Sequence, residues 1–278
     1  MFGREYANHP EILLSSFKQM NSEYKRLGKR GKKKLLQRIY LYIFGIPEIG
    51  FQLRSLYFSS IISKKLGNKK LNKILDAGSG IGVYTFWLAK KYSMATIIGG
   101  EIDYEKINFC KEYSKINRFQ NVEFKKFDVT SPVKKGGEYN LIVNIDVLEH
   151  IEDYKNVLKN FHKLLGKGGY LYIHTPQPNQ TRIIKSFKKW SHEDHLREGY
   201  TPEELAQTLR KLRFKIVSIR QTFGFFGKLA WELSHLSFKK GFVVAGIAYP
   251  ITYLIALIDL LTTNKNGLGT AILAQKVK

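Results

Sequence analysis

From residue 71 onward, short apolar runs alternate with longer amphipathic stretches, which is the pattern of βα units around a parallel sheet. The run at residues 139–145 is the most continuously apolar and is expected to lie near the centre of the sheet. We predict a doubly wound α/β domain over residues 71–278, with seven mostly parallel strands. The predicted strands are residues 73–78, 95–102, 121–129, 139–145, 170–176, 214–223 and 268–276.

The intervening amphipathic stretches predict helices at residues 83–92, 104–117 and 153–165. The third of these is expected to stop at the glycines that follow it, because glycine suits the residue after a helix end. Thr201, with proline next and glutamate three positions later, forms a capping box and predicts the start of a further helix.

Residues 1–70 form a separate, basic segment, which we predict to be a helical N-terminal extension. It holds 15 Lys and Arg against 4 Asp and Glu, and its densest basic run is Lys25–Arg38. A basic helix with an apolar end is typical of a contact with a membrane surface or with nucleic acid. A solvated helical face is the alternative.

The composition narrows the classes of partner. Hydrophobic residues make up 44% of the 278 residues, enough for a sizeable core and too many for a disordered chain. A single cysteine excludes a disulfide framework. The formal charge of +23 favours anionic partners such as acidic lipid, nucleic acid or a phosphorylated ligand. The start of the chain shows no signal peptide pattern, so we expect a cytoplasmic protein.

An apolar insert separates the sixth and seventh predicted strands, at residues 223–267. Its second half, Gly241–Leu261, carries one charge, Asp259, and is long enough to span a bilayer. The two flanking strands must pair in one sheet, which argues against a single crossing, and Pro250 is expected to kink a helix. We predict a helical pair embedded in one leaflet. A buried lid, a homodimer face and a crossing pair are the alternatives.

The first predicted strand ends in a glycine-rich turn over residues 75–82. A dinucleotide fingerprint would need glycine at position 83, where the chain has Val83. Asp76, just before the first glycine, would repel a pyrophosphate and suits a cationic ligand. The chain also lacks the phosphate-binding loop motif of nucleotide triphosphatases.

These residues resemble the first motif of class I S-adenosylmethionine-dependent methyltransferases. The later segments at residues 144–150, 166–176 and 195–205 are similar to the ubiquinone-biosynthesis branch of that family. The resemblance implies that Glu101 binds the ribose hydroxyls and that Asp128 contacts the adenine, unless Asp128 only starts a turn. Asp103 is predicted as a helix N-cap. The residues assigned in this way to S-adenosyl-L-methionine are Asp76, Gly78, Ser79, Gly80, Gly82, Glu101, Ile102, Asp128, Val129, Asn144 and Ile145, with Arg54 as an upstream candidate.

The segment after the fourth strand, residues 144–150, supplies the acceptor-side candidates. His150 is either a base or acceptor-positioning residue, or a histidine buried by packing at a helix start. His192 and His195 lie in a predicted loop over the pocket, where they either contact the substrate or face solvent. The segment departs from the N-P-P-[YF] motif, which weighs against a nucleic-acid amino-methyltransferase.

Three potential metal ligands fall at helical spacing in the same segment: Asp146, Glu149 and His150. The mitochondrial ubiquinone O-methyltransferase is similar at this spacing and holds magnesium. Many relatives carry the same letters without a metal, so no metal is expected.

The sequence therefore predicts methyl transfer to an apolar lipid or isoprenoid-like acceptor, by a peripheral or monotopic protein on an anionic inner membrane face. One alternative is a methyltransferase of a soluble small molecule or glycan. Another is a non-catalytic cofactor-binding protein that acts as a membrane or RNA adaptor.

Overall fold

The computed structural model describes residues 2, 4, 39–133, 136–184 and 196–277. The basic run Lys25–Arg38 and the two histidines His192 and His195 lie outside the described residues, so the predictions made for them stay predictions. The side chain of Phe242 is likewise outside the description.

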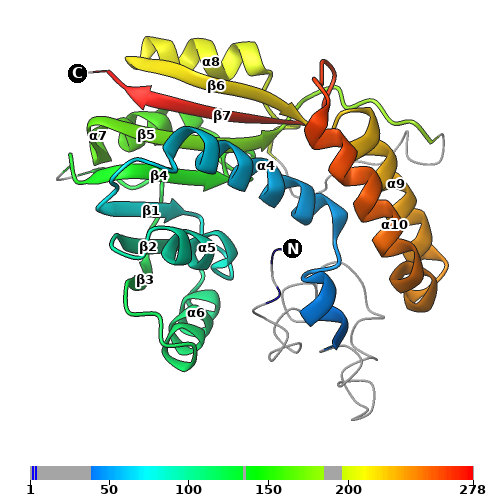
Figure 1. The fold of residues 1–278 in the computed structure, drawn as a ribbon. Coiled ribbons are helices and arrows are strands. Elements are labelled where there is room, and N and C mark those ends of the chain that lie inside the picture. The colour runs from blue at the N-terminus through cyan, green and yellow to red at the C-terminus, as the bar shows by residue number, and fades with distance from the viewer. Residues whose placement is uncertain (1, 3, 5–38, 134–135, 185–195, 278) are drawn as a thin grey trace.

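A seven-stranded sheet forms the centre of the molecule, in the order β3-β2-β1-β4-β5-β7-β6 (Figure 1). The first five strands pair in parallel, whereas β7 runs antiparallel to both of its neighbours. The predicted α/β class and the mostly parallel sheet are therefore confirmed. The strands are β1 (Lys73–Ala77), β2 (Thr96–Glu101), β3 (Val122–Lys126), β4 (Tyr139–Ile145), β5 (Leu165–Pro176), β6 (Phe214–Thr222) and β7 (Gly269–Lys276).

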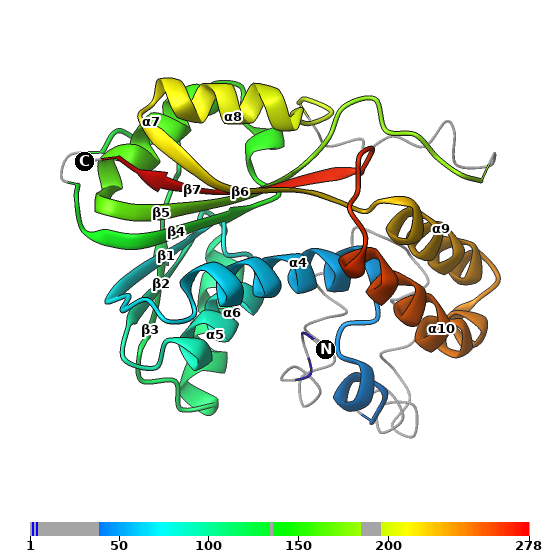
Figure 2. The same cartoon turned by 45° about the horizontal axis from the view of Figure 1, so that its top comes forward.

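Helices cover both faces of the sheet (Figure 2). One face packs against α7 (Tyr154–Leu164) and α8 (Pro202–Lys211), with Phe161 and Leu205 in the shared core. The other face packs against α4 and α5, with Phe58 and Leu88 fully buried. These helices are α4 (Ile49–Leu66) and α5 (Val83–Lys91), and α6 (Tyr104–Ile116) packs beside α5.

Two strand boundaries differ by three residues or more from the sequence-based expectation, and the others differ by at most one. β3 ends at Lys126, three residues early, because the chain turns at Asp128. β5 begins at Leu165, which already pairs with Tyr139 of β4 before a shift in the register between the two strands. The strand therefore contains the glycines that were expected only to stop the preceding helix.

The insert between β6 and β7 folds into two helices, α9 (Phe225–Lys239) and α10 (Phe242–Leu261), beyond the carboxyl ends of the parallel strands (Figure 1). Both pack against the start of α4 in a cluster that includes Leu53 and Trp231. α10 continues through Pro250. The proline cannot donate to the carbonyl of Gly246, which accepts a hydrogen bond from the Tyr40 hydroxyl at 3.0 Å.

Candidate active site

The glycine-rich turn between β1 and α5 requires its glycines. Gly78, Gly80 and Gly82 all have positive φ, at 86°, 54° and 81°. A Cβ on Gly78 would lie 2.4 Å from the side chain of Val147, in the loop after β4. Gly80 faces open space, so the loop backbone there is accessible to a ligand.

Glu101 connects the end of β2 to this loop. One carboxylate oxygen accepts a hydrogen bond from Gly80 N at 2.8 Å, and the other accepts from Ile102 N and Asp103 N at 2.8 and 3.1 Å. The carboxylate of Asp103 in turn accepts from the backbone of the first turn of α6, which confirms the predicted N-cap. Glu101 therefore lies at the loop with its carboxylate oriented by three backbone donors.

Two buried oxygen atoms near this loop fit a polar ligand. Among the described residues, Ser79 Oγ and Asn144 Oδ1 are buried and have no hydrogen-bond partner. The Asn144 amide nitrogen donates to Ala77 O at 2.8 Å, which fixes the side chain at the ends of β1 and β4. Unpaired buried polar atoms are rare in folded proteins. These two atoms lie among the residues assigned to the cofactor, so the site fits S-adenosylmethionine.

Asp128 forms a turn after β3. Its carboxylate accepts from Thr130 N at 2.8 Å and from the Thr130 hydroxyl at 2.6 Å, and these bonds lower the pKa of Asp128. Phe127 N donates to Glu101 O at 2.9 Å, which holds this turn beside the end of β2. Asp128 is exposed and Val129 is buried. The turn role is confirmed, and the contact with adenine stays a prediction.

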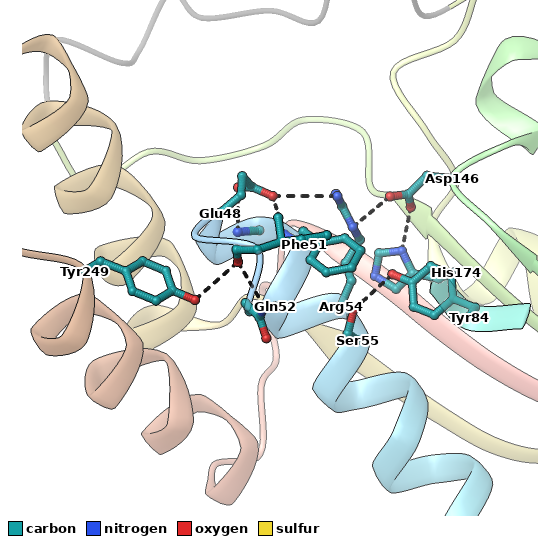
Figure 3. Close-up of polar contacts among 11 residues, drawn as sticks. Glu48, Phe51, Gln52, Arg54, Ser55, Tyr84, Asp146, His174 and Tyr249 are labelled. Atoms are coloured by element: carbon teal, nitrogen blue, oxygen red, sulfur yellow. Dashed lines mark hydrogen bonds and ion pairs between the residues drawn. The ribbon is translucent and has the colours of Figure 1, made fainter. Parts of the chain in front are cut away.

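Arg54 reaches the loop after β4 from α4 (Figure 3). Its Nε lies 2.9 Å from Asp146 Oδ2, and its guanidinium also approaches Glu48 at 4.0 Å. Burial acts to lower the pKa of Arg54, but the carboxylates of Asp146 and Glu48 outweigh it and raise the pKa. Arg54 is therefore a charged partner of Asp146, and its predicted contact with the cofactor stays a prediction.

Asp146 also contacts His174 at the end of β5 (Figure 3). His174 Nδ1 and Asp146 Oδ1 share a hydrogen bond of 2.6 Å, and His174 Nε2 lies 3.0 Å from the Thr222 hydroxyl. Asp146 has φ 52°, a left-handed conformation that is uncommon outside glycine. Such backbone is kept where its surroundings over-determine it, as at functional sites.

The expected common helical face for three metal ligands is wrong. Only residues 148–150 form a short 3-10 turn, and Asp146 lies outside it with left-handed backbone. Among the described residues, no group of three His, Cys, Asp or Glu side chains could hold a metal ion.

Glu149 and His150 have opposite environments. Glu149 is buried, and the Thr175 hydroxyl donates to its carboxylate at 3.3 Å. Burial, and then the nearby Asp146 carboxylate, raises the pKa of Glu149 to about 8. His150 is exposed, so the expectation of a histidine buried at a helix start is wrong. Its backbone N–H donates to Val147 O in the 3-10 turn.

A pocket of about 260 Å³ lies next to these residues. Its polar wall comes from Arg54, Asp146, Glu149, His150 and His174, and its apolar wall comes from Phe223, Trp231 and Leu268 in and beside the insert. A larger open groove of about 690 Å³ between α8 and β6 contains none of the predicted site residues. The smaller pocket therefore joins the acceptor-side charges to the apolar insert.

His174 and Thr222 were missed from the sequence. His174 is the one histidine in the apolar run at residues 170–176, at its carboxyl end. In the parallel register it lies opposite Ile145, one residue before Asp146. A histidine at that end of a buried strand was the available signal.

The chemistry of the glycine turn gives a pH-dependent prediction. Burial raises the pKa of Asp76 to about 7, although the Thr85 hydroxyl donates to it at 2.6 Å and acts in the opposite direction. Between pH 4 and pH 7 the unfolded chain loses this proton while the folded chain keeps it, so the group costs stability as pH rises. The full cost above pH 7 is about 4 kcal/mol.

We therefore expect the unfolding free energy of Asp76→Asn, compared with that of the parent chain, to increase as pH rises from 4 to 8. The increase should be at most about 4 kcal/mol. Urea denaturation at both pH values measures it. A difference between the two proteins that is constant across this range would show that Asp76 does not titrate there.

The sheet order, the glycine turn and the acidic residue at the end of β2 define the class of an S-adenosylmethionine-dependent methyltransferase. A family model described as "Methyltransferase domain" matches residues 52–219, more than half of the chain, and the chain belongs to that family. The resemblance expected from the sequence is confirmed. The match begins inside α4, the helix that carries Arg54.

Curated relatives and solved structures agree with this family. The chain is 20% identical to a ubiquinone biosynthesis O-methyltransferase of Acinetobacter baylyi, over 56% of this chain and 68% of that protein. It is 32% identical to phosphoethanolamine N-methyltransferase 1 of Triticum aestivum over 39% of this chain, but spans only 22% of that protein's length. A Haemonchus contortus phosphoethanolamine N-methyltransferase 2 in complex with S-adenosyl-L-methionine has a similar fold, with a TM-score of 0.58 and 17% sequence identity. The similarity covers 80% of this chain and 53% of that chain.

Proposed function

We propose that the protein transfers a methyl group from S-adenosylmethionine to an apolar lipid or isoprenoid-like acceptor at a membrane surface. The observation that carries this proposal is the pocket, because its polar wall holds the acceptor-side charges and its apolar wall is built by the insert. An apolar acceptor would place its tail against Trp231 and Phe223 and its reacting group near Asp146. The similarity to a ubiquinone biosynthesis O-methyltransferase supports the same class of acceptor.

The bound cofactor supplies an electrophilic methyl on a sulfonium, and the residues of the chain hold the acceptor in line with it. The Asp146 carboxylate, whose two oxygens contact Arg54 and His174, accepts a hydrogen bond from the acceptor and takes its proton on transfer. The Arg54 guanidinium favours the negative charge that develops on the acceptor as the proton leaves.

The membrane part of the proposal is supported by α10. It is the one helix, among the described residues, that is long and apolar enough to span a bilayer, with mean hydropathy 1.9 over residues 243–261. Only 33% of the residues in that window are buried. We propose a peripheral or monotopic position on the anionic, cytoplasmic face of a membrane. A homodimer face or a soluble acceptor would give other results in the tests below.

Pairs of acceptor probes test the proposed function. Radiolabelled methyl transfer is measured to pentadecylcatechol and phosphatidylethanolamine in vesicles, and to their water-soluble counterparts catechol and phosphoethanolamine. We expect at least tenfold more transfer to the membrane-held member of one pair. Transfer confined to the soluble members would refute a lipid acceptor. Calorimetric binding of the cofactor without transfer to any probe would favour the adaptor alternative.

The acceptor-side residues make a separate prediction. We expect Asp146→Asn to lower kcat by about 100-fold, because the amide cannot take a proton. Calorimetric affinity for the cofactor should change far less than kcat, because Asp146 is not itself assigned to the cofactor and asparagine has the same size. His150→Ala is the comparison, because His150 lines the same pocket from an exposed position. A larger loss in His150→Ala than in Asp146→Asn would assign the base to His150.

A further inference from the structure

One face of α10 is apolar and exposed along its whole length. Side chains three or four residues apart on the helix point the same way, and here they form one continuous stripe. The exposure reaches 76% at Val243 and 87% at Leu261, near the two ends of the helix. We call this stripe the docking face; its residues are Val243, Ile247, Ile251, Leu254, Ile258 and Leu261.

The opposite side of α10 is fixed to the protein. Tyr249, Tyr253 and Ala256 are buried in the cluster shared with α4 and α9. The Asp259 carboxylate is fully buried and accepts a hydrogen bond from the Tyr57 hydroxyl of α4 at 2.8 Å. A helix that spanned a bilayer would have to leave these partners. The docking face can therefore contact lipid only while α10 lies along the surface of a membrane.

Charges around the docking face have one sign. In the described side chains of the insert, residues 223–267, both acidic groups are fully buried: Glu232 and Asp259. The exposed charged side chains of the insert are all lysines. They are Lys239 and Lys240 at the turn before α10 and Lys265 just after it. An apolar stripe with cations at both ends matches a bilayer with anionic headgroups, because lysine side chains extend to the headgroup level.

A second exposed apolar segment lies next to α10. The helical residues 39–44 contact it through Tyr40, whose hydroxyl donates to Gly246 O at 3.0 Å. Ile39, Tyr42 and Ile43 of this segment are exposed. In the sequence it directly follows the run Lys25–Arg38, which holds eight Lys and Arg. In the sequence, the most basic part of the chain therefore directly precedes an exposed apolar segment beside α10.

We propose that the docking face binds the headgroup region of one anionic lipid leaflet, with α10 parallel to the membrane plane. Apolar burial of the stripe gives binding that resists salt, and the lysines add an attraction that salt weakens. The proposal deepens the proposed function by naming the partner that presents the acceptor. It rests on that function only for the identity of what is methylated, since docking itself requires no turnover.

Vesicle sedimentation tests the proposal with the full chain. The probes are 100 nm vesicles of phosphatidylcholine alone and of phosphatidylcholine with phosphatidylglycerol, at low salt and at 0.5 M NaCl. We expect at least tenfold tighter binding to the anionic vesicles, reduced but not abolished at high salt. The double variant Ile251→Ser, Leu254→Ser should lose at least tenfold in affinity under both salt conditions.

The matched control is Met94→Ser, Ile116→Ser, which removes two exposed apolar side chains outside the insert. It should bind vesicles like the parent chain, and both double variants should keep calorimetric affinity for the cofactor. The proposal would be overturned if the parent chain does not sediment with either kind of vesicle. The proposal would also be overturned if the parent chain is a dimer in analytical ultracentrifugation and the Ile251→Ser, Leu254→Ser variant is a monomer that binds vesicles as tightly as the parent. The docking face would then bind a second copy of the chain.

The same preparations separate this proposal from the proposed function. Vesicle binding that depends on Ile251 and Leu254, together with methyl transfer only to soluble probes, would leave the docking face standing and refute the lipid acceptor. Methyl transfer to membrane-held probes that is unchanged in the double variant would refute the docking face as the presenting surface.

Discussion

Replacing Glu101 with alanine is expected to weaken S-adenosylmethionine binding by at least 100-fold. The resemblance assigns two ribose hydroxyls to this carboxylate, and each charge-assisted hydrogen bond contributes about 1.5–3 kcal/mol. The structure adds a second cause. The carboxylate also accepts from Gly80 N at 2.8 Å, so its removal takes away a bond that orients the glycine loop. Isothermal titration calorimetry measures the affinity.

Asp103→Ala is the control for Glu101→Ala. Asp103 is only two residues away and also carries a carboxylate, but that group caps α6 by accepting from Glu105 N at 2.8 Å. Loss of a helix N-cap costs about 1 kcal/mol of stability. We expect a small change in stability and little change in cofactor affinity. Equal affinities in the parent chain and in Glu101→Ala would refute the ribose assignment.

Replacing Asp259 with alanine is expected to cost about 4 kcal/mol or more of unfolding free energy. Its carboxylate joins α10 to α4 and to the start of α9, whose N-cap residue, Gly224, has no side chain that could accept from the first turn. Buried donors that lose their acceptor cost about 1–3 kcal/mol each. The donors are the Tyr57 hydroxyl at 2.8 Å, Gly227 N at 2.9 Å, Gly224 N at 3.2 Å and Asn264 Nδ2 at 3.2 Å.

Urea denaturation of Asp259→Ala and Asp259→Asn measures this contribution. Asparagine keeps one acceptor oxygen, so its loss should be about half that of alanine. Cofactor affinity should survive in both variants, because none of the groups that donate to the Asp259 carboxylate belongs to a residue assigned to the cofactor. A stability of Asp259→Ala within 1 kcal/mol of the parent would mean that this carboxylate does not hold the insert on the protein.

Local patterns in the sequence predicted the cofactor side of the site. The glycine turn at residues 78–82 follows directly from its residues, because positive φ at three positions favours glycine. Asp103 was also identifiable from the local sequence as an N-cap, because capping involves only backbone donors within three residues. The strand order of a doubly wound fold then brings the ends of β1 and β2 together.

The acceptor side could not be predicted in this way. Arg54, Asp146 and His174 come from three elements, and their contacts depend on how α4 packs across the sheet and on the register of β4 with β5. Helical spacing suggested a common face for Asp146 and His150, and it failed because Asp146 adopts left-handed backbone to reach two partners.

The apolar insert also combines a property that the sequence predicts with one that depends on tertiary packing. Its length and composition determined that residues 241–261 are apolar enough to enter a membrane. Hydropathy averages over all sides of a helix, so it cannot show which side meets protein. Packing decided that Asp259 faces Tyr57 and that Ile251 and Leu254 face outward. The sequence by itself determined the elements and the cofactor turn, because their constraints act between neighbouring residues. Only the tertiary structure decided the pocket lined by Arg54, Asp146 and His174 and the exposed apolar face of α10, because these depend on contacts between segments far apart in the chain.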